Sequence, residues 1–138
     1  MILYLDSSDI VKLYAQEADS ERMKGLVAQA ADLATSRIAY AEVRCALSRK
    51  RREGLVAPGD YAKAVSAFRT DWRRFVVVEV AQQVVELAAD LSEAHVLRGM
   101  DAIHLASAKL LADSLSVPIR VSSSDQRLGA AAKAEGLA

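Results

Sequence analysis

Four acidic residues stand where they could act together on a metal ion: Asp6, Glu42, Asp101 and Asp125. Carboxylates that converge without cations repel one another and raise one another's pKa, and a divalent metal relieves that repulsion. Mg²⁺ and Mn²⁺ prefer carboxylate and water oxygens. The residue types therefore indicate a magnesium or manganese site, provided that the fold brings the four side chains together.

A simpler interpretation applies to two of these acids. Asp101 and Asp125 each stand at the start of a predicted helix, where an Asp most often serves as a cap. The other two are less easily explained in this way. Asp6 ends an apolar run, and Glu42 interrupts the small and apolar stretch from Ile38 to Val43. Spacing alone leaves both interpretations open, and the joint pattern favours a shared site.

The elements that must position these acids alternate along the chain. Short apolar runs predict buried strands over 2–5, 33–36, 75–80 and 118–121. Helical spacing predicts helices over 20–31, 39–53, 58–74, 82–96 and 102–112, another after a Ser7 or Ser8 cap, and a last one that runs to Ala134. This pattern predicts a single α/β domain over residues 1–138, a three-layer α/β/α sandwich around a mostly parallel sheet. Ligands of such sheets bind beyond the carboxyl ends of the strands, where Asp6 and Asp125 are expected.

The composition of the 138 residues narrows the class of protein. Hydrophobic residues make up 52%, which excludes global disorder, and 18 basic residues balance 18 acidic ones. Cys45 is the only cysteine, so a disulfide framework and a zinc site of paired cysteines are excluded, and we interpret it as a small core residue. Neither a secretory signal nor an apolar run long enough for a membrane helix is visible, so we expect a cytoplasmic protein.

Four segments resemble, in order, the signatures of PIN-domain nucleases. These are Asp6-Ser7-Ser8, Tyr40-Ala41-Glu42-Val43-Arg44, Leu97 to Ala106, and Ser123 to Leu128. Among PIN domains the chain is most similar to the VapC-type ribonuclease toxins of type II toxin–antitoxin systems, from Ile2 to Leu137. Asp9 departs from the pattern, because the family has an apolar or small residue at this position.

The resemblance implies a PIN-like fold and metal-dependent endonucleolytic cleavage of RNA by a metal-activated water. Its acidic quartet falls on Asp6, Glu42, Asp101 and Asp125, with Asp6 and Asp101 as central metal ligands and the other two as further ligands. Its small hydroxyl residues fall on Ser7 or Ser8 and on Ser123. The partners that the resemblance implies are an RNA substrate, a small cognate antitoxin and a second copy of the chain in a homodimer. No membrane partner is expected.

Basic residues gather in the segment from Arg44 to Arg74, where nine of them accompany three acids for a net charge of +6. This segment could bind a phosphate backbone, and Arg44, Arg49, Arg51 and Arg73 are its candidate RNA contacts. A solvated helical face or an antitoxin-binding surface is an equal alternative. Tyr61 and Trp72, in the same segment, are interpreted as core anchors rather than base-stacking residues.

Two further points of the sequence keep alternatives open. His104 follows Asp101 by three residues within an apolar stripe, so we interpret it as a packed histidine first and as a proton carrier second. The whole chain could also be a catalytically inactive PIN-like RNA-binding module or another metal-dependent phosphohydrolase. The phosphohydrolase interpretation is weaker because Asp6 and Asp9 are separated by two residues and not by one.

Overall fold

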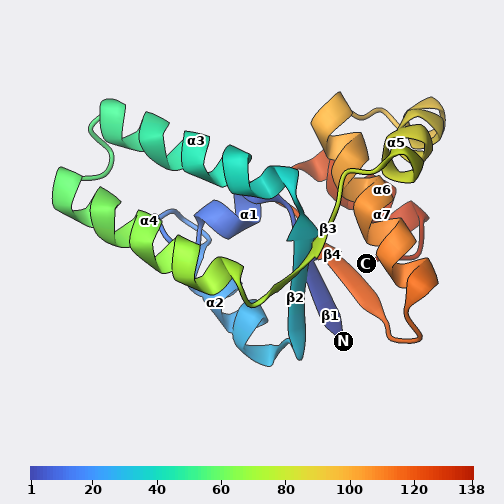
Figure 1. Ribbon diagram of the computed structural model, residues 1–138, viewed down its shortest axis with the longest axis horizontal. Helices are drawn as coiled ribbons and strands as arrows, with labels where there is room; N and C mark the ends of the chain where they lie inside the picture. Colours follow the sequence, from blue (N-terminus) through green and yellow to red (C-terminus); the bar gives the residue numbers. More distant parts are fainter.

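The computed structural model describes residues 1–138 and contains four strands and seven helices (Figure 1). Their order is β1 (Ile2–Leu5), α1 (Ser7–Val11), α2 (Ser20–Gln29), β2 (Asp32–Ser36), α3 (Ile38–Arg52), α4 (Pro58–Trp72), β3 (Phe75–Val78), α5 (Gln82–Ala94), α6 (Gly99–Ser114), β4 (Ile119–Ser122) and α7 (Gln126–Ala134). Every predicted strand and helix is present. No helix is long and apolar enough to cross a membrane.

The four strands form one sheet in the order β3-β2-β1-β4, and every neighbouring pair is parallel. In the central strand, Ile2 lies opposite Asp32 of β2 and Ile119 of β4. Because all strands run the same way, their carboxyl ends lie at one edge, which we call the carboxyl edge. The predicted α/β fold is confirmed, with a sheet that is fully parallel.

Helices cover both faces of the sheet, with α1 to α4 on one side and α5 to α7 on the other (Figure 1). Successive side chains of β1 point to opposite faces of the sheet, so this one strand contributes residues to two hydrophobic cores. Ile2 and Tyr4 belong to the core under α5, α6 and α7, whereas Leu3 and Leu5 belong to the core under α1, α3 and α4. The predicted three-layer sandwich is therefore confirmed.

Two helix starts differ from the sequence expectation. The carboxylate of Asp6, and not Ser7 or Ser8, caps α1 by accepting the Asp9 N–H. The sixth helix begins at Gly99 with Arg98 as its cap, so Asp101 lies inside the first turn and caps nothing. The cap interpretation of Asp101 is therefore wrong, which leaves its carboxylate available for another role.

The topology places three helix starts at the carboxyl edge. The first turns of α1 and α3 lie there because each helix follows the end of a strand by one or two residues. The start of α6 lies there because α6 ends just before β4, whose first residue is at the opposite edge. Strands β1 and β4 and helices α3 and α6 thus carry the predicted acids to the same edge.

Candidate active site

Asp6 is a buried carboxylate held by three donors. Its side chain comes from the end of β1, and the residue is 4% exposed. Ser8 donates its hydroxyl to Oδ1 at 2.7 Å, Ser123 donates to Oδ2 at 2.5 Å, and the Asp9 N–H donates to Oδ1 at 3.1 Å. Burial raises the pKa of Asp6, and these hydrogen bonds oppose the rise. The Asp6 side chain is therefore held in one orientation by the first turn of α1 and by the loop that follows β4.

Three consecutive serines at the end of β4 are divided between two buried aspartates. Ser122 donates to the carboxylate of Asp9 at 2.6 Å and Ser124 donates to its other oxygen, while Ser123 between them donates to Asp6. Asp9 is fully buried, and the Nζ atom of Lys12 lies 3.6 Å from its Oδ1. Asp9, the departure from the family pattern, thus holds the segment that brings Ser123 to Asp6.

A chain of hydrogen bonds runs from the sheet to Glu42. The Tyr4 hydroxyl lies 2.8 Å from His104 Nδ1, and His104 Nε2 lies 2.8 Å from Glu42 Oε1. An ionised carboxylate only accepts, so the Nε2–H of His104 donates to Glu42. His104 is 2% exposed, which confirms the packed histidine. Its bond to Glu42 was not predicted, since nothing in the helix pattern names a partner 62 residues away.

Asp101 and Asp125 line one hollow at the carboxyl edge. Its volume is about 260 Å³, and the other lining residues are Arg98, Gln126 and Arg127. Burial, followed by the charge of Asp125, raises the pKa of Asp101. Asp125 also caps α7, because its Oδ1 accepts the N–H groups of Arg127 and Leu128. The cap interpretation of Asp125 is therefore confirmed, and its Oδ2 accepts no hydrogen bond within the chain.

Three of the predicted acids are electrostatic neighbours and Asp6 is linked to them through Ser123, but the four do not form a closed cage. The charges of Asp125 and Glu42 both reach Asp101, and Ser123 connects Asp6 to the Asp125 backbone through bonds of 2.5 and 3.0 Å. No group of three Asp, Glu, His or Cys side chains is close enough as placed to bind a metal ion. The donor set nevertheless fits a hard cation, since it offers carboxylate oxygens whose burial and repulsion a cation would offset.

Comparison with known proteins identifies the family. The family model of the PIN domain matches residues 3–134. This chain belongs to the PIN-domain family. It is 36% identical over 135 residues to Ribonuclease VapC45 of Mycobacterium tuberculosis (strain CDC 1551 / Oshkosh), which covers 98% of this chain and 92% of that relative. The similarity to VapC ribonucleases that the four segments indicated is confirmed.

Solved structures show the same fold. The crystal structure of Mycobacterium tuberculosis VapC20, described as a Sarcin-Ricin loop cleaving toxin, has a TM-score of 0.66 and 19% identity, and the match covers 94% of each chain. A toxin–antitoxin complex from Klebsiella pneumoniae has a TM-score of 0.65 and 18% identity, and covers 91% of this chain and 88% of that chain. The sandwich described above is therefore the PIN fold.

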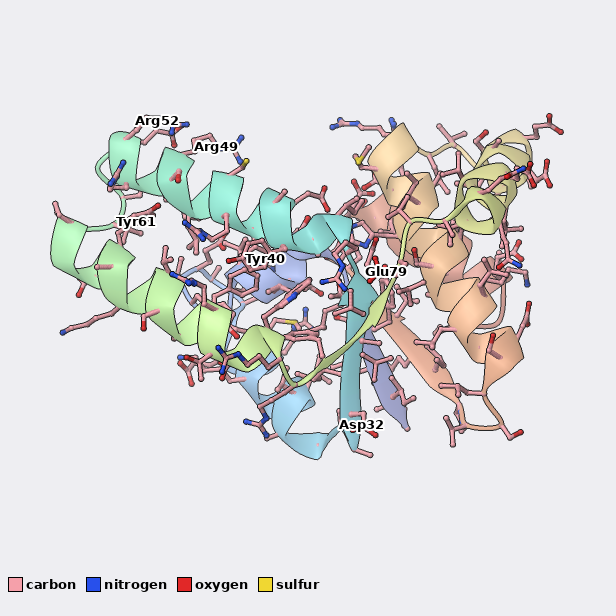
Figure 2. All side chains as sticks on the ribbon, in the orientation of Figure 1. Asp32, Tyr40, Arg49, Arg52, Tyr61 and Glu79 are labelled. Atoms are coloured by element: carbon pink, nitrogen blue, oxygen red, sulfur yellow. The ribbon has the colours of Figure 1, made fainter.

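In this PIN domain the predicted RNA-contact arginines separate onto different surfaces. Arg49 lines a second hollow at the carboxyl edge, of about 350 Å³, together with Ser7, Ser8, Glu42 and Cys45. Cys45 is exposed, so its assignment to the core is wrong. Figure 2 shows Arg49 on the side of α3 that faces away from α4, whereas Tyr61 points between the two helices. Of the four arginines, Arg49 alone lies beside a predicted acid.

The other three predicted arginines lie toward α4. The guanidinium of Arg51 lies over the Tyr61 ring, 4.5 Å from its centroid. Arg44 and Arg73 line a separate pocket between α3 and α4. Trp72 packs against Tyr40 and other core rings, as expected for a core anchor. A continuous RNA-binding face made of all four arginines is therefore not what the fold builds.

Proposed function

We propose that this PIN domain is the endoribonuclease toxin of a toxin–antitoxin pair and cleaves RNA at the carboxyl edge with Mg²⁺ or Mn²⁺. The observation that carries the proposal is the shared neighbourhood of Asp101, Asp125 and Glu42, to which Ser123 links the buried Asp6. The VapC ribonucleases to which the chain is similar support the same reaction. A bound divalent ion supplies a water that is nucleophilic near neutral pH and stabilises charge on the phosphoryl oxygens.

Three carboxylates would hold the ion, and the other residues position them. Asp6, Asp101 and Asp125 are the proposed ligands, because the first is pre-oriented by its serine donors and the other two line one hollow. Ser8 and Ser123 keep the oxygens of Asp6 in place, and Ser7 lies in the same helix start. Fixed ligand orientations of this kind increase metal affinity, because little ordering is left to occur on binding.

Glu42 and Arg49 would act on the substrate side. They lie seven residues apart on α3, so they share one face of the helix and line the same hollow. His104 fixes the Glu42 carboxylate, which leaves its other oxygen to accept a proton from an attacking water. Arg49 forms no ion pair within the chain and borders the hollow, so its guanidinium can bind an RNA phosphate beside the acids.

The proposed partners are a small cognate antitoxin and a second copy of the chain. The toxin–antitoxin complex from Klebsiella pneumoniae, which has the same fold, supports the antitoxin. Purification of the chain from its host, followed by measurement of the mass in solution, tests both expectations. A stoichiometric small protein is expected with it, and a mass of one free chain would contradict both.

The deciding experiment compares two substitutions on α6. Asp101→Asn removes the charge of a proposed ligand, whereas Asp113→Asn removes the charge of an exposed acid at the far end of the same helix. Cleavage of end-labelled RNA by the purified protein should require Mg²⁺ or Mn²⁺ and should stop in a chelator. Asp101→Asn should reduce the rate by at least about 100-fold, and Asp113→Asn should leave it unchanged.

Two results would refute the proposal. One is cleavage that continues in the chelator or in folded Asp101→Asn protein. The other is RNA binding by the wild-type protein without cleavage under any divalent ion, which would make the chain an inactive RNA-binding module.

A further inference from the structure

A basic pocket lies between α3 and α4, away from the predicted acids. Its volume is about 440 Å³, and we call it the arginine pocket after its lining residues Arg44, Tyr61, Ala62, Val65, Ser66, Arg69, Thr70 and Arg73. Arg44 follows Glu42 by two residues, which turns the side chains about 200° apart around the helix. The buried face of α3 lies between the Glu42 and Arg44 side chains. The arginine pocket and the hollow lined by Glu42 and Arg49 therefore open on opposite flanks of this helix.

The arginine pocket holds positive charge without a counterion. No acidic side chain lines it. None of the ion pairs of the chain involves Arg44, Arg69 or Arg73. A group of arginines that lacks acidic partners is suited to binding an anion from outside the chain.

Arg44 has a donor that nothing in the chain satisfies. One of its terminal nitrogens, Nη1, donates to the Tyr40 hydroxyl at 3.2 Å, and the Tyr40 ring stacks on Phe68 with 5.4 Å between centroids. The Nε atom of Arg44 is buried without a hydrogen-bond partner, and it is the only such side-chain atom in the molecule. Buried donors are almost always paired. The bond to Tyr40 thus holds the Arg44 guanidinium in place in the lining of the arginine pocket. Because Nε is covered by the chain, a ligand in the pocket would be bound by the terminal nitrogens of Arg44.

We propose that the arginine pocket binds a phosphate of the RNA backbone and anchors the substrate at a distance from the cleavage site. This inference rests on the proposed function, which makes RNA the substrate. Three guanidinium groups offer paired donors that match phosphate oxygens, and Ser66 and Thr70 add hydroxyls on the same helix face.

An acidic protein segment fits the arginine pocket less well. Protein interfaces depend on buried aromatic or aliphatic anchors. Here the apolar lining beyond Tyr61 consists of Ala62 and Val65, and the Tyr61 ring is already covered by Arg51. A backbone phosphate, by contrast, needs charged and hydroxyl donors, which Arg44, Arg69, Arg73, Ser66 and Thr70 supply. The lining therefore favours the nucleic-acid backbone over a peptide.

The first test measures RNA binding in a chelator, so that cleavage is not required. The double variant Arg69→Gln/Arg73→Gln removes two exposed pocket arginines, and Arg22→Gln/Arg120→Gln removes two exposed arginines elsewhere, so the net charges match. The pocket variant should bind a long single-stranded RNA about 10-fold more weakly, and the slope of log Kd against log salt should fall by about 0.7 for each phosphate that the variant no longer neutralises. The control should retain the wild-type slope.

The second test uses the metal-loaded protein and separates this inference from the proposed function. For a long RNA the pocket variant should raise KM and leave kcat unchanged, and for an RNA too short to reach both sites neither constant should change.

Wild-type protein that cleaves RNA while both double variants bind it equally well overturns the pocket and leaves the nuclease intact. Weaker binding of the pocket variant to an acidic peptide, with RNA affinity unchanged, also overturns it. Wild-type protein that binds through the pocket but never cleaves supports the pocket and refutes the nuclease.

Discussion

Glu42 on α3 accepts a hydrogen bond of 2.8 Å from His104 on α6, and this contact joins the two helix layers above the carboxyl edge. The layers cover opposite faces of the sheet (Figure 1). Tyr4 of the central strand completes the connection by bonding the other ring nitrogen of His104. The proposed substrate-side acid is therefore positioned by the core itself and not by a surface loop.

The Tyr4–His104 pair should behave as a coupled unit. His104→Leu leaves the buried Tyr4 hydroxyl without this partner, so the free energy of unfolding should fall by about 1–3 kcal/mol. Adding Tyr4→Phe removes the unpaired hydroxyl, so the double variant should lose less than the sum of the two single losses. Denaturant unfolding of all four proteins gives the coupling. Strict additivity would show that the two side chains do not depend on each other.

Asp9 should matter far more than another acid that contacts the same lysine. Asp9→Ala leaves Lys12 in a buried position without its nearest buried acid and removes the acceptor of Ser122 and Ser124, so a loss of about 3–5 kcal/mol is expected. Asp19, which lies 3.5 Å from the same Lys12 Nζ, is half exposed. Asp19→Ala should cost about 1 kcal/mol or less. Equal losses in the two variants would contradict the structural role given to Asp9.

The pH dependence of stability should reveal the raised pKa of Asp6. A carboxyl group whose pKa is higher in the folded state binds its proton more tightly there, so in a chelator the protein loses stability as pH rises from the ordinary value of about 4 through the raised one. Asp6→Asn removes this penalty. Thermal unfolding between these pH values should show that the Tm of Asp6→Asn protein rises relative to the Tm of the wild type as pH rises. A difference that shrinks with rising pH would contradict it.

Added divalent ion should stabilise the wild-type protein more than the Asp6→Asn variant. The wild-type protein with Asp6 intact should gain Tm with Mg²⁺ or Mn²⁺ near neutral pH, because a ligand that binds only the folded state stabilises it. Asp6→Asn protein should gain less. Equal gains would remove Asp6 from the proposed set of ligands.

The contribution of Glu135 to stability should change with pH in the opposite direction to that of Asp6. His95, followed by Lys109, lowers the pKa of Glu135, and the two contacts measure 2.8 and 3.2 Å. A lowered pKa stabilises the fold above the ordinary value, and this contribution is lost as pH falls through the lower one. Glu135→Gln should therefore be less stable than the wild type near neutral pH, and the difference should shrink as pH falls from the ordinary value of about 4 through the lowered pKa. A gap that persists in acid would mean that the charge of Glu135 is not involved.

The sequence by itself determined the parallel sheet, the helix layers and the edge at which the acids gather. Apolar runs such as Ile2–Leu5 are buried on both faces only in a covered parallel sheet, and a polar residue such as Asp6 must follow directly where the strand ends. These are local properties with fixed periods, so a single sequence carries them. The family resemblance then assigned roles to the acids that periodicity alone could not assign.

Only the tertiary structure decided which of these side chains meet. The division of three consecutive serines between Asp6 and Asp9 depends on hydrogen bonds that span 113 to 117 residues, and the bond from His104 to Glu42 spans 62. The arginines of one basic segment separate because α3 turns by about 100° at each residue and packs against a different helix on each flank. Contacts of this kind arise from how helices and strands dock, and no local pattern encodes them.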